Sequence, residues 1–222
     1  ASLTKSGRVA SSSIVRRTLF GRPASVAAVP SRSSRRLLIA ALAVALVAAA
    51  PARADQETAT LGAVTATFSY TRGAEEGQYR NLRIAVTRAG VAAYDRAISI
   101  RACGEPYCVP AGYETSSLKV VDLSGDGEPE VVVDVYTGGA HCCIWSVALS
   151  WNGSAYRTRT HDWRDPGYAL EDGDGDGRPE FISADARFAY EFASFAGWGL
   201  PVQIWSLDPA KGFVDVTGRL RS

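Results

Sequence analysis

Apolar and polar residues alternate along most of the chain that follows residue 54. Turn residues separate the alternating runs, and the Asn152-Gly153 pair is typical of a β-hairpin. No stretch in this part of the chain has the spacing of a long amphipathic helix. The pattern predicts an all-β domain of mainly antiparallel strands. The runs cover residues 64–71, 82–95, 117–122, 130–136, 144–158, 180–192 and 201–208.

The first 54 residues have the pattern of an export signal. They contain nine Lys or Arg and no Asp or Glu, then an apolar run at 37–50 and a small-x-small site at Ala52 and Ala54. The run has 14 residues, fewer than the roughly 20 that span a bilayer. We expect cleavage after Ala54 and a secreted, periplasmic or cell-envelope location. Arg35-Arg36 resembles a twin-arginine motif, so twin-arginine export and general secretion are both open.

The predicted mature chain, residues 55–222, is acidic. It keeps all 23 Asp and Glu but only 15 of the 24 Lys and Arg, so its formal charge is −8. This charge disfavours nucleic acid as a partner. Its 168 residues are enough for one domain with a hydrophobic core.

An internal repeat organises this domain. VVDLSGDGEPEVVV at 120–133 aligns with LEDGDGDGRPEFIS at 170–183, an offset of 50 residues. A unit of this length with about four short strands is typical of one blade of a β-propeller. We expect about three such units, at 55–115, 116–165 and 166–222. Closed propellers usually have at least four blades, so an incomplete propeller, a sandwich-like packing and closure as a homo-oligomer are all open.

Each copy of the repeat contains a loop with oxygen-bearing side chains at positions 1, 3, 5 and 9 and glycine at position 6. Together with the carbonyl of position 7, these groups can wrap one hard cation, and calcium suits them better than zinc. An EF-hand would need glutamate at position 12, where this chain has Val133 and Ser183. Acidic Asp-Gly turns without metal are the alternative. The candidate ligands are Asp122, Ser124, Asp126 and Glu130 in the first loop and Asp172, Asp174, Asp176 and Glu180 in the second.

These loops resemble the calcium loops of FG-GAP and VCBS repeats, the blades of integrin α-chain propellers and of many secreted bacterial proteins. The family pattern D-x-[DNS]-x-D-G-x-x-[DE] matches both loops, whereas the FG-GAP tripeptides are absent and residues 55–115 contain no such loop. The resemblance implies that the eight side chains named above bind calcium and that Glu128 and Arg178 contribute only their carbonyls. Because Ser124 replaces an acid in the first loop, we expect the second loop to bind calcium more tightly.

Four cysteines in a chain predicted to be exported indicate disulfides. Local pairing of Cys103 with Cys108 and of Cys142 with Cys143 is preferred, while crossed pairing between the two clusters is open. His141 lies beside the second cluster and raises the alternative of a zinc or copper site. We prefer a disulfide-pinned turn, because adjacent cysteines on a strand point to opposite faces and oxidation removes thiolate ligands.

Aromatic residues alternate at Phe188, Tyr190 and Phe192. The preferred interpretation is the buried face of a strand, and the alternative is a stacking platform for sugars or peptides. Tyr190 and Trp198 are the candidate ligand contacts, and Trp198 lies outside the regular alternation.

The sequence contains no G-x-S-x-G or H-E-x-x-H motif. We therefore expect an exported calcium-binding protein without catalysis, which acts as a structural, adhesion or ligand-binding module. Its partner would be a protein or carbohydrate outside the cell or in the cell envelope. A small secreted hydrolase of glycosidase type, which uses a loop or strand carboxylate, is the alternative.

Overall fold

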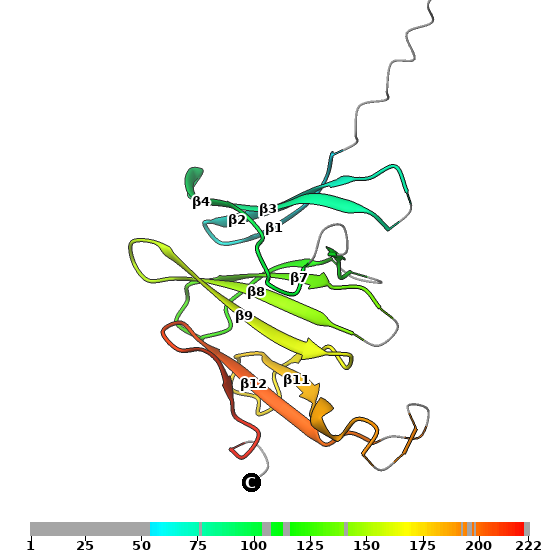
Figure 1. The fold of residues 1–222 in the computed structure, drawn as a ribbon. Helices are drawn as coiled ribbons and strands as arrows, with labels where there is room; N and C mark the ends of the chain where they lie inside the picture. Colours follow the sequence, from blue (N-terminus) through cyan, green and yellow to red (C-terminus); the bar gives the residue numbers. More distant parts are fainter. Residues whose placement is uncertain are drawn as a thin grey trace, which may run out of the picture. The chain divides into compact units, whose positions relative to one another are not determined.

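Three antiparallel sheets follow one another along the chain (Figure 1). They lie within one compact unit, residues 49–222. The prediction of an all-β, antiparallel fold is confirmed, and the propeller stays a prediction. The computed structural model describes residues 54–75, 77–103, 108–112, 116–139, 142–191, 193–194, 197 and 199–219.

The first sheet has the order β1-β2-β3-β4, so each strand pairs with the next one in the sequence. Gly62 and Gly90 form the tight turns with φ of 57° and 80°, a region that glycine enters without a steric penalty. Along β2, Val64, Ala66 and Phe68 are buried at alternate positions, as the pattern predicts. The strands are β1 (Ala54–Leu61), β2 (Val64–Arg72), β3 (Tyr79–Arg88) and β4 (Val91–Ala97).

The second and third sheets each begin with short strands. In the second sheet β5 and β6 pair with one edge of β7, and β8 and β9 follow on the other side. The third sheet has the order β10-β11-β12-β13. The strands of the second sheet are β5 (Val109–Pro110), β6 (Leu118–Val121), β7 (Glu130–Tyr136), β8 (Ile144–Trp151) and β9 (Tyr156–Arg164). Those of the third are β10 (Ala169–Glu171), β11 (Glu180–Ala184), β12 (Val202–Asp208) and β13 (Gly212–Asp215).

The second sheet has a hydrophobic core on each face, which explains the unbroken apolar run of β7. Val131 and Val133 belong to a core that includes Phe68 of the first sheet. Val132 belongs to a second core, with Phe181 of the third sheet. A strand covered on both faces needs apolar residues at successive positions. Figure 1 shows β7, β8 and β9 between the other two sheets.

The strand predicted over residues 180–192 is wrong beyond Ala184, where β11 ends. Asp185 accepts a hydrogen bond from the backbone N–H of Arg187 at 3.1 Å and caps a short 3-10 helix, η1 (Ala186–Phe188). Phe188 and Tyr190 are 37% and 57% exposed, so their interpretation as the buried face of a strand is also wrong. Tyr190 has φ of 64°, outside the β region.

Candidate functional site

Two acidic loops occupy equivalent places in the second and third sheets. The first acidic loop, residues 122–130, joins β6 to β7, and the second acidic loop, residues 172–180, joins β10 to β11. In the first, Val121 pairs with Glu130 across the two strands, and the equivalent pairing recurs at the second. The repeat in the sequence is therefore also a repeat in the sheet topology.

The carboxylate of Asp122 holds the first acidic loop in shape. Its Oδ1 accepts a hydrogen bond from the N–H of Gly125 at 2.7 Å, and its Oδ2 accepts one from Gly127 at 2.9 Å. Both glycines have positive φ, 72° and 83°. Asp126 Oδ1 accepts a hydrogen bond from the N–H of Glu128 at 2.8 Å. Hydrogen bonds to the backbone thus fix the carboxylates of positions 1 and 5.

The second acidic loop repeats this arrangement and adds a third carboxylate. Asp172 accepts hydrogen bonds from the N–H groups of Gly175 at 2.8 Å and Gly177 at 2.9 Å. Oxygens of Asp172, Asp174 and Asp176 all lie within 4.8 Å of one another, and the three residues are exposed. Since calcium–oxygen distances are about 2.4 Å, oxygens this close can contact the same ion. The spacing of these oxygens therefore allows them to contact one metal ion.

Position 9 is a buried glutamate in both loops. Glu130 is 1% exposed, and its Oε2 accepts a hydrogen bond from the N–H of Leu123 at 2.9 Å. Burial raises the pKa of Glu130 to about 7, although the Leu123 N–H opposes the shift. Glu180 accepts a hydrogen bond from the Gly173 N–H at 2.9 Å, and burial also raises its pKa. A cation beside these glutamates would stabilise their charged forms.

The first acidic loop is fastened to the first sheet through Glu128, at position 7. Its carboxylate accepts two hydrogen bonds from Arg88 of β3, one of them between Nη2 and Oε2 at 2.7 Å. The guanidinium of Arg88 lies 4.5 Å from the ring centroid of Trp151 and donates to Tyr156 Oη at 3.3 Å. Ser124 Oγ, at position 3, is buried, and no described residue hydrogen-bonds to it.

Arg178 brings the two loops into contact. Its Nε donates to Asp176 Oδ2 at 2.8 Å. The hydrogen bonds from the side chain and backbone of Arg178 hold the pKa of Asp176 below its ordinary value. Its side chain also lies over Gly125, where an added Cβ would come within 2.6 Å of Arg178 Cγ. Residues of both loops, among them Ser124 and Glu180, line one cavity of about 390 Å³. The loops are therefore neighbours, although 50 residues separate them in the sequence.

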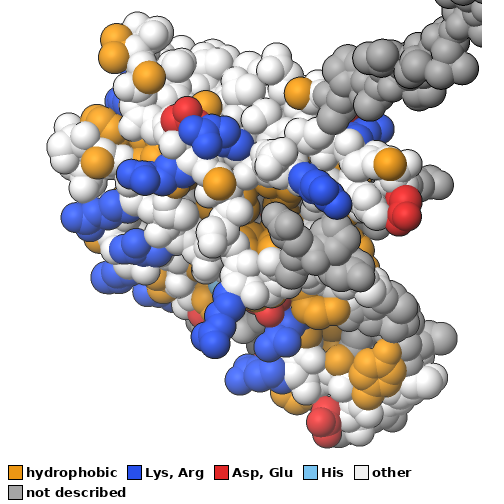
Figure 2. Space-filling view, turned by 45° about the horizontal axis from the view of Figure 1, so that its top comes forward, with side chains coloured by type: hydrophobic (Ala, Val, Ile, Leu, Met, Phe, Trp, Pro, Cys, Tyr) orange, Lys and Arg blue, Asp and Glu red, His pale blue; other side chains and the backbone are white. Residues whose placement is uncertain are grey.

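Charge is unevenly distributed over the surface. Figure 2 shows a face with many Lys and Arg side chains and few Asp and Glu, although the chain from residue 55 onward carries a formal charge of −8. This face therefore does not reflect the net charge of the chain.

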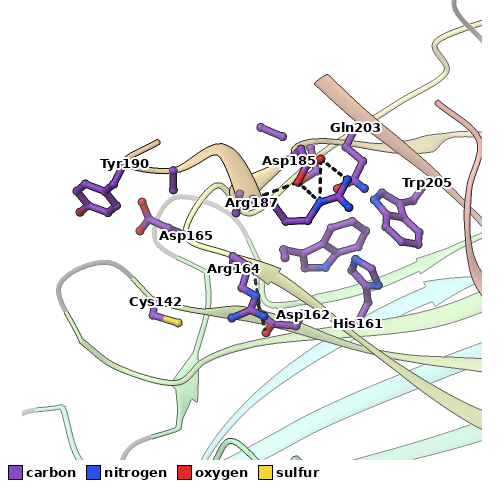
Figure 3. Close-up of a pocket in the computed structure, with 15 residues that line it drawn as sticks. Cys142, His161, Asp162, Arg164, Asp165, Asp185, Arg187, Tyr190, Gln203 and Trp205 are labelled. Atoms are coloured by element: carbon purple, nitrogen blue, oxygen red, sulfur yellow. Dashed lines mark hydrogen bonds and ion pairs between the residues drawn. The ribbon is translucent and has the colours of Figure 1, made fainter. Parts of the chain in front are cut away.

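A second candidate site lies between the second and third sheets, as an inter-sheet cavity of about 600 Å³ (Figure 3). This volume is within the range of small-molecule sites, about 300–1,000 Å³. Residues of β9, β11, η1 and β12 line it. Its labelled residues are Cys142, His161, Asp162, Arg164, Asp165, Asp185, Arg187, Tyr190, Gln203 and Trp205.

Two of the three aspartates of the inter-sheet cavity are paired with arginines. Arg164 Nε lies 3.2 Å from Asp162 Oδ2. Arg187 Nε and Nη2 donate to Asp185 Oδ1 and Oδ2 at 2.8 and 2.5 Å, and these bonds lower the pKa of Asp185. The two arginines expose 65% and 82% of their side chains, so both guanidinium groups can reach a bound molecule, whereas Asp162 and Asp185 expose 23% and 11%.

His161 forms an aromatic wall of the inter-sheet cavity. Its ring centroid lies 4.1 Å from that of Trp163, 4.3 Å from that of Trp205 and 5.0 Å from that of Phe213. Burial lowers the pKa of His161 to about 4, while Asp162 has a smaller opposing effect. The imidazole is therefore neutral at pH 7.

The cysteines and the predicted ligand contacts are the remaining residues that the sequence singled out. Disulfides join Cys103 to Cys108 and Cys142 to Cys143, the local pairing. Tyr190 lines the inter-sheet cavity. His141, Phe192 and Trp198 lie outside the described residues.

Sequence reasoning missed a buried polar network centred on Asp134, which is 5% exposed. Its carboxylate accepts hydrogen bonds from Lys119 Nζ at 2.5 Å, Ser146 Oγ at 2.5 Å and Tyr168 Oη at 2.7 Å. Trp163 Nε1 donates to Ser146 Oγ at 2.7 Å. An aspartate inside the apolar run EVVVDVY was the signal that could have indicated it. Every oxygen named here is already hydrogen-bonded, so the network fits a structural role.

Two known proteins are similar to part of the chain, whereas no family model and no solved structure matches it. One is a "Probable thylakoid lumen protein" from Synechocystis sp., 38% identical over 104 residues, which are 45% of this chain and 30% of that protein. Another is an uncharacterized protein from Sinorhizobium fredii, 37% identical over 82 residues, which are 36% of this chain and 13% of that protein. The chain thus spans less than a third of either relative.

The Synechocystis relative is named for the thylakoid lumen, a compartment that proteins reach by export across a membrane, in agreement with the predicted export of this chain. Within the part of the chain that the structure describes, no helix has the length and hydropathy required to cross a membrane.

Proposed function

We propose that this protein is an exported calcium-binding module of the FG-GAP/VCBS type, which binds a ligand outside the cytoplasm and performs no catalysis. The cluster of Asp172, Asp174 and Asp176 oxygens within 4.8 Å carries the calcium part of the proposal. Arg178 offsets the charge of Asp176 only, so the three carboxylates still repel one another unless a further cation neutralises them. Carboxylate and carbonyl oxygens are the ligands that calcium prefers.

Calcium in these loops would serve as a structural clamp. Each loop joins two adjacent antiparallel strands, β6 to β7 and β10 to β11, and the first loop is also tied to β3 through Arg88. A cation that binds only the folded loops stabilises the folded state. The ligand-binding part of the proposal rests on the inter-sheet cavity.

A calcium-dependent melting temperature is the test. In a metal-free sample, millimolar calcium should raise the melting temperature, since extracellular calcium sites have dissociation constants of about 0.1–1 mM. At 100 times the dissociation constant, one site adds about 2.7 kcal/mol to the free energy of unfolding. Magnesium should substitute poorly, because it demands a smaller octahedral shell. A melting temperature that is indifferent to calcium and to chelator would leave the loops as acidic turns.

Hydrolysis is a second candidate function, supported by one observation. Glu180 lies in the cavity between the loops, and burial raises its pKa, which favours the protonated form that a general acid requires. The paired state of Asp162 and Asp185 argues against these two acids in that role. A screen of glycosidase, esterase and peptidase substrates decides between the two functions. Turnover that Glu180→Gln abolishes in a folded protein would replace the binding module with a hydrolase.

A further inference from the structure

We propose that the inter-sheet cavity binds a neutral oligosaccharide. This inference rests on the proposed ligand-binding function and adds the chemistry of the ligand. It is independent of whether the acidic loops bind calcium, because the inter-sheet cavity and the loop cavity have no lining residue in common.

Two of the three aspartates that line the inter-sheet cavity are paired with arginines, and the third, Asp165, adds a negative charge that disfavours an anionic ligand. Arg164 and Arg187 each have an aspartate partner, and His161 is neutral at pH 7. An anion would have to compete with Asp162 and Asp185 for those guanidinium groups. A cation would have to compete with the two arginines for the same carboxylates. Neither sign of charge gains an unpaired partner from these two pairs.

The polar groups of the inter-sheet cavity match hydroxyl groups. Each Asp–Arg pair presents acceptor oxygens beside donor N–H groups, and Gln203 offers both kinds in one amide. A hydroxyl donates and accepts at the same time, so neighbouring hydroxyls of a sugar can bond to both members of such a pair.

Aromatic rings lie at both ends of the inter-sheet cavity. Tyr190 is at one end, and His161 and Trp205 are at the other, with the two Asp–Arg pairs between them (Figure 3). The C–H faces of sugar rings pack on aromatic rings, while their hydroxyls point outward to polar groups. This sequence of aromatic, polar and aromatic surfaces suits several linked sugars better than one.

Isothermal titration of the full chain in millimolar calcium tests the proposal. The probes are neutral tetrasaccharides from cellulose, starch, chitin and xylan, with heparin and polygalacturonate fragments as acidic probes. We expect saturable binding of at least one neutral tetrasaccharide. Arg187→Ala and Tyr190→Ala should each weaken it about tenfold, the effect of one lost contact. Arg157→Ala, on exposed β9 surface outside the inter-sheet cavity, is the matched control and should leave binding unchanged.

Three results would overturn the proposal: no neutral tetrasaccharide bound at millimolar concentration, binding restricted to acidic fragments, or undiminished binding in both cavity variants. Melting curves of each variant verify that it is folded. The calcium shift of the melting temperature is measured on the same samples. A protein that responds to calcium but binds no sugar would contradict only this inference, whereas one that binds sugar without a calcium response would contradict only the calcium sites.

Discussion

The acidic loops and the inter-sheet cavity contain the same kind of residue in opposite electrostatic settings. In the second acidic loop, Asp172, Asp174 and Asp176 face one another, and Arg178 is paired with only one of them. In the inter-sheet cavity, Asp162 and Asp185 each have an arginine of their own. Unpaired carboxylates attract a cation, while paired ones present neutral hydrogen-bonding edges. Pairing, and not the number of aspartates, separates the two kinds of site.

The largest effect is expected when one carboxylate of the second acidic loop loses its charge. Asp174→Asn removes a unit charge from the second acidic loop and should weaken calcium binding there by about 1,000-fold, which makes it undetectable. Asp162→Asn, in the inter-sheet cavity, is the matched control and should leave calcium binding unchanged. Equilibrium dialysis against calcium measures both. An equal loss of calcium in the two variants would show that pairing does not distinguish the sites.

Acid should act on the inter-sheet cavity through His161. The ordinary pKa of histidine is 6.5 and that of His161 is about 4, so between these values acid protonates only the unfolded chain. The free energy of unfolding should therefore fall as the pH drops from 6.5 to 4, by up to about 3 kcal/mol from this residue. Urea unfolding with chelator present measures the fall, which His161→Phe should reduce. An unchanged pH profile in His161→Phe would contradict the assignment.

Substitution of Arg88 and of Arg187 allows the ion pairs of the acidic loops and of the inter-sheet cavity to be compared. Arg88 is partly buried against Trp151 and holds Glu128 of the first acidic loop, so Arg88→Ala should lower the free energy of unfolding by about 2 kcal/mol. Arg187→Ala removes a guanidinium that is 82% exposed, and Asp185 keeps its hydrogen bond from the backbone N–H of residue 187, so the loss of stability should be smaller. Urea unfolding of both variants is the measurement. If Arg187→Ala lowered the free energy of unfolding more than Arg88→Ala, burial would not explain the difference between the two ion pairs.

The smallest effect concerns the counter-charge of the second acidic loop. Arg178 is bound to Asp176 and offsets the additional charge that Asp174 gives this loop over the first. Arg178→Gln should therefore strengthen calcium binding there, by up to about fivefold. The expectation that the second loop binds more tightly than the first should hold most clearly in this variant. Weaker binding in Arg178→Gln would mean that Arg178 supports the site instead of competing for it.

The sequence predicted what depends on local spacing. The alternation of Val64, Ala66 and Phe68 indicated a strand with one buried face, and the 50-residue repeat indicated two equivalent loops. Strand ends were less predictable: the run at 82–95 is two strands, β3 and β4, joined at Gly90. The polar strand β1 was not predicted, because its partly buried positions are Asp55, Glu57 and Ala59, so its alternating exposure is not matched by an apolar–polar alternation in the sequence.

Contacts between sheets could not be predicted. The Arg88–Glu128 pair joins residues 40 positions apart, and the position of Arg178 over Gly125 depends on how the second and third sheets pack. The inter-sheet cavity arises from the same packing. The alternation at Phe188 and Tyr190 gave the wrong structure, because the Asp185 cap outweighed a weak strand pattern.

Diffraction from crystals soaked in millimolar calcium tests the central claim most directly, since anomalous scattering locates calcium without assumptions about ligands. The account predicts an ion in each acidic loop, about 2.3–2.6 Å from its carboxylate oxygens, and none between Asp162 and Asp185. Acidic loops without an ion, or calcium bound at the paired aspartates instead, would contradict it.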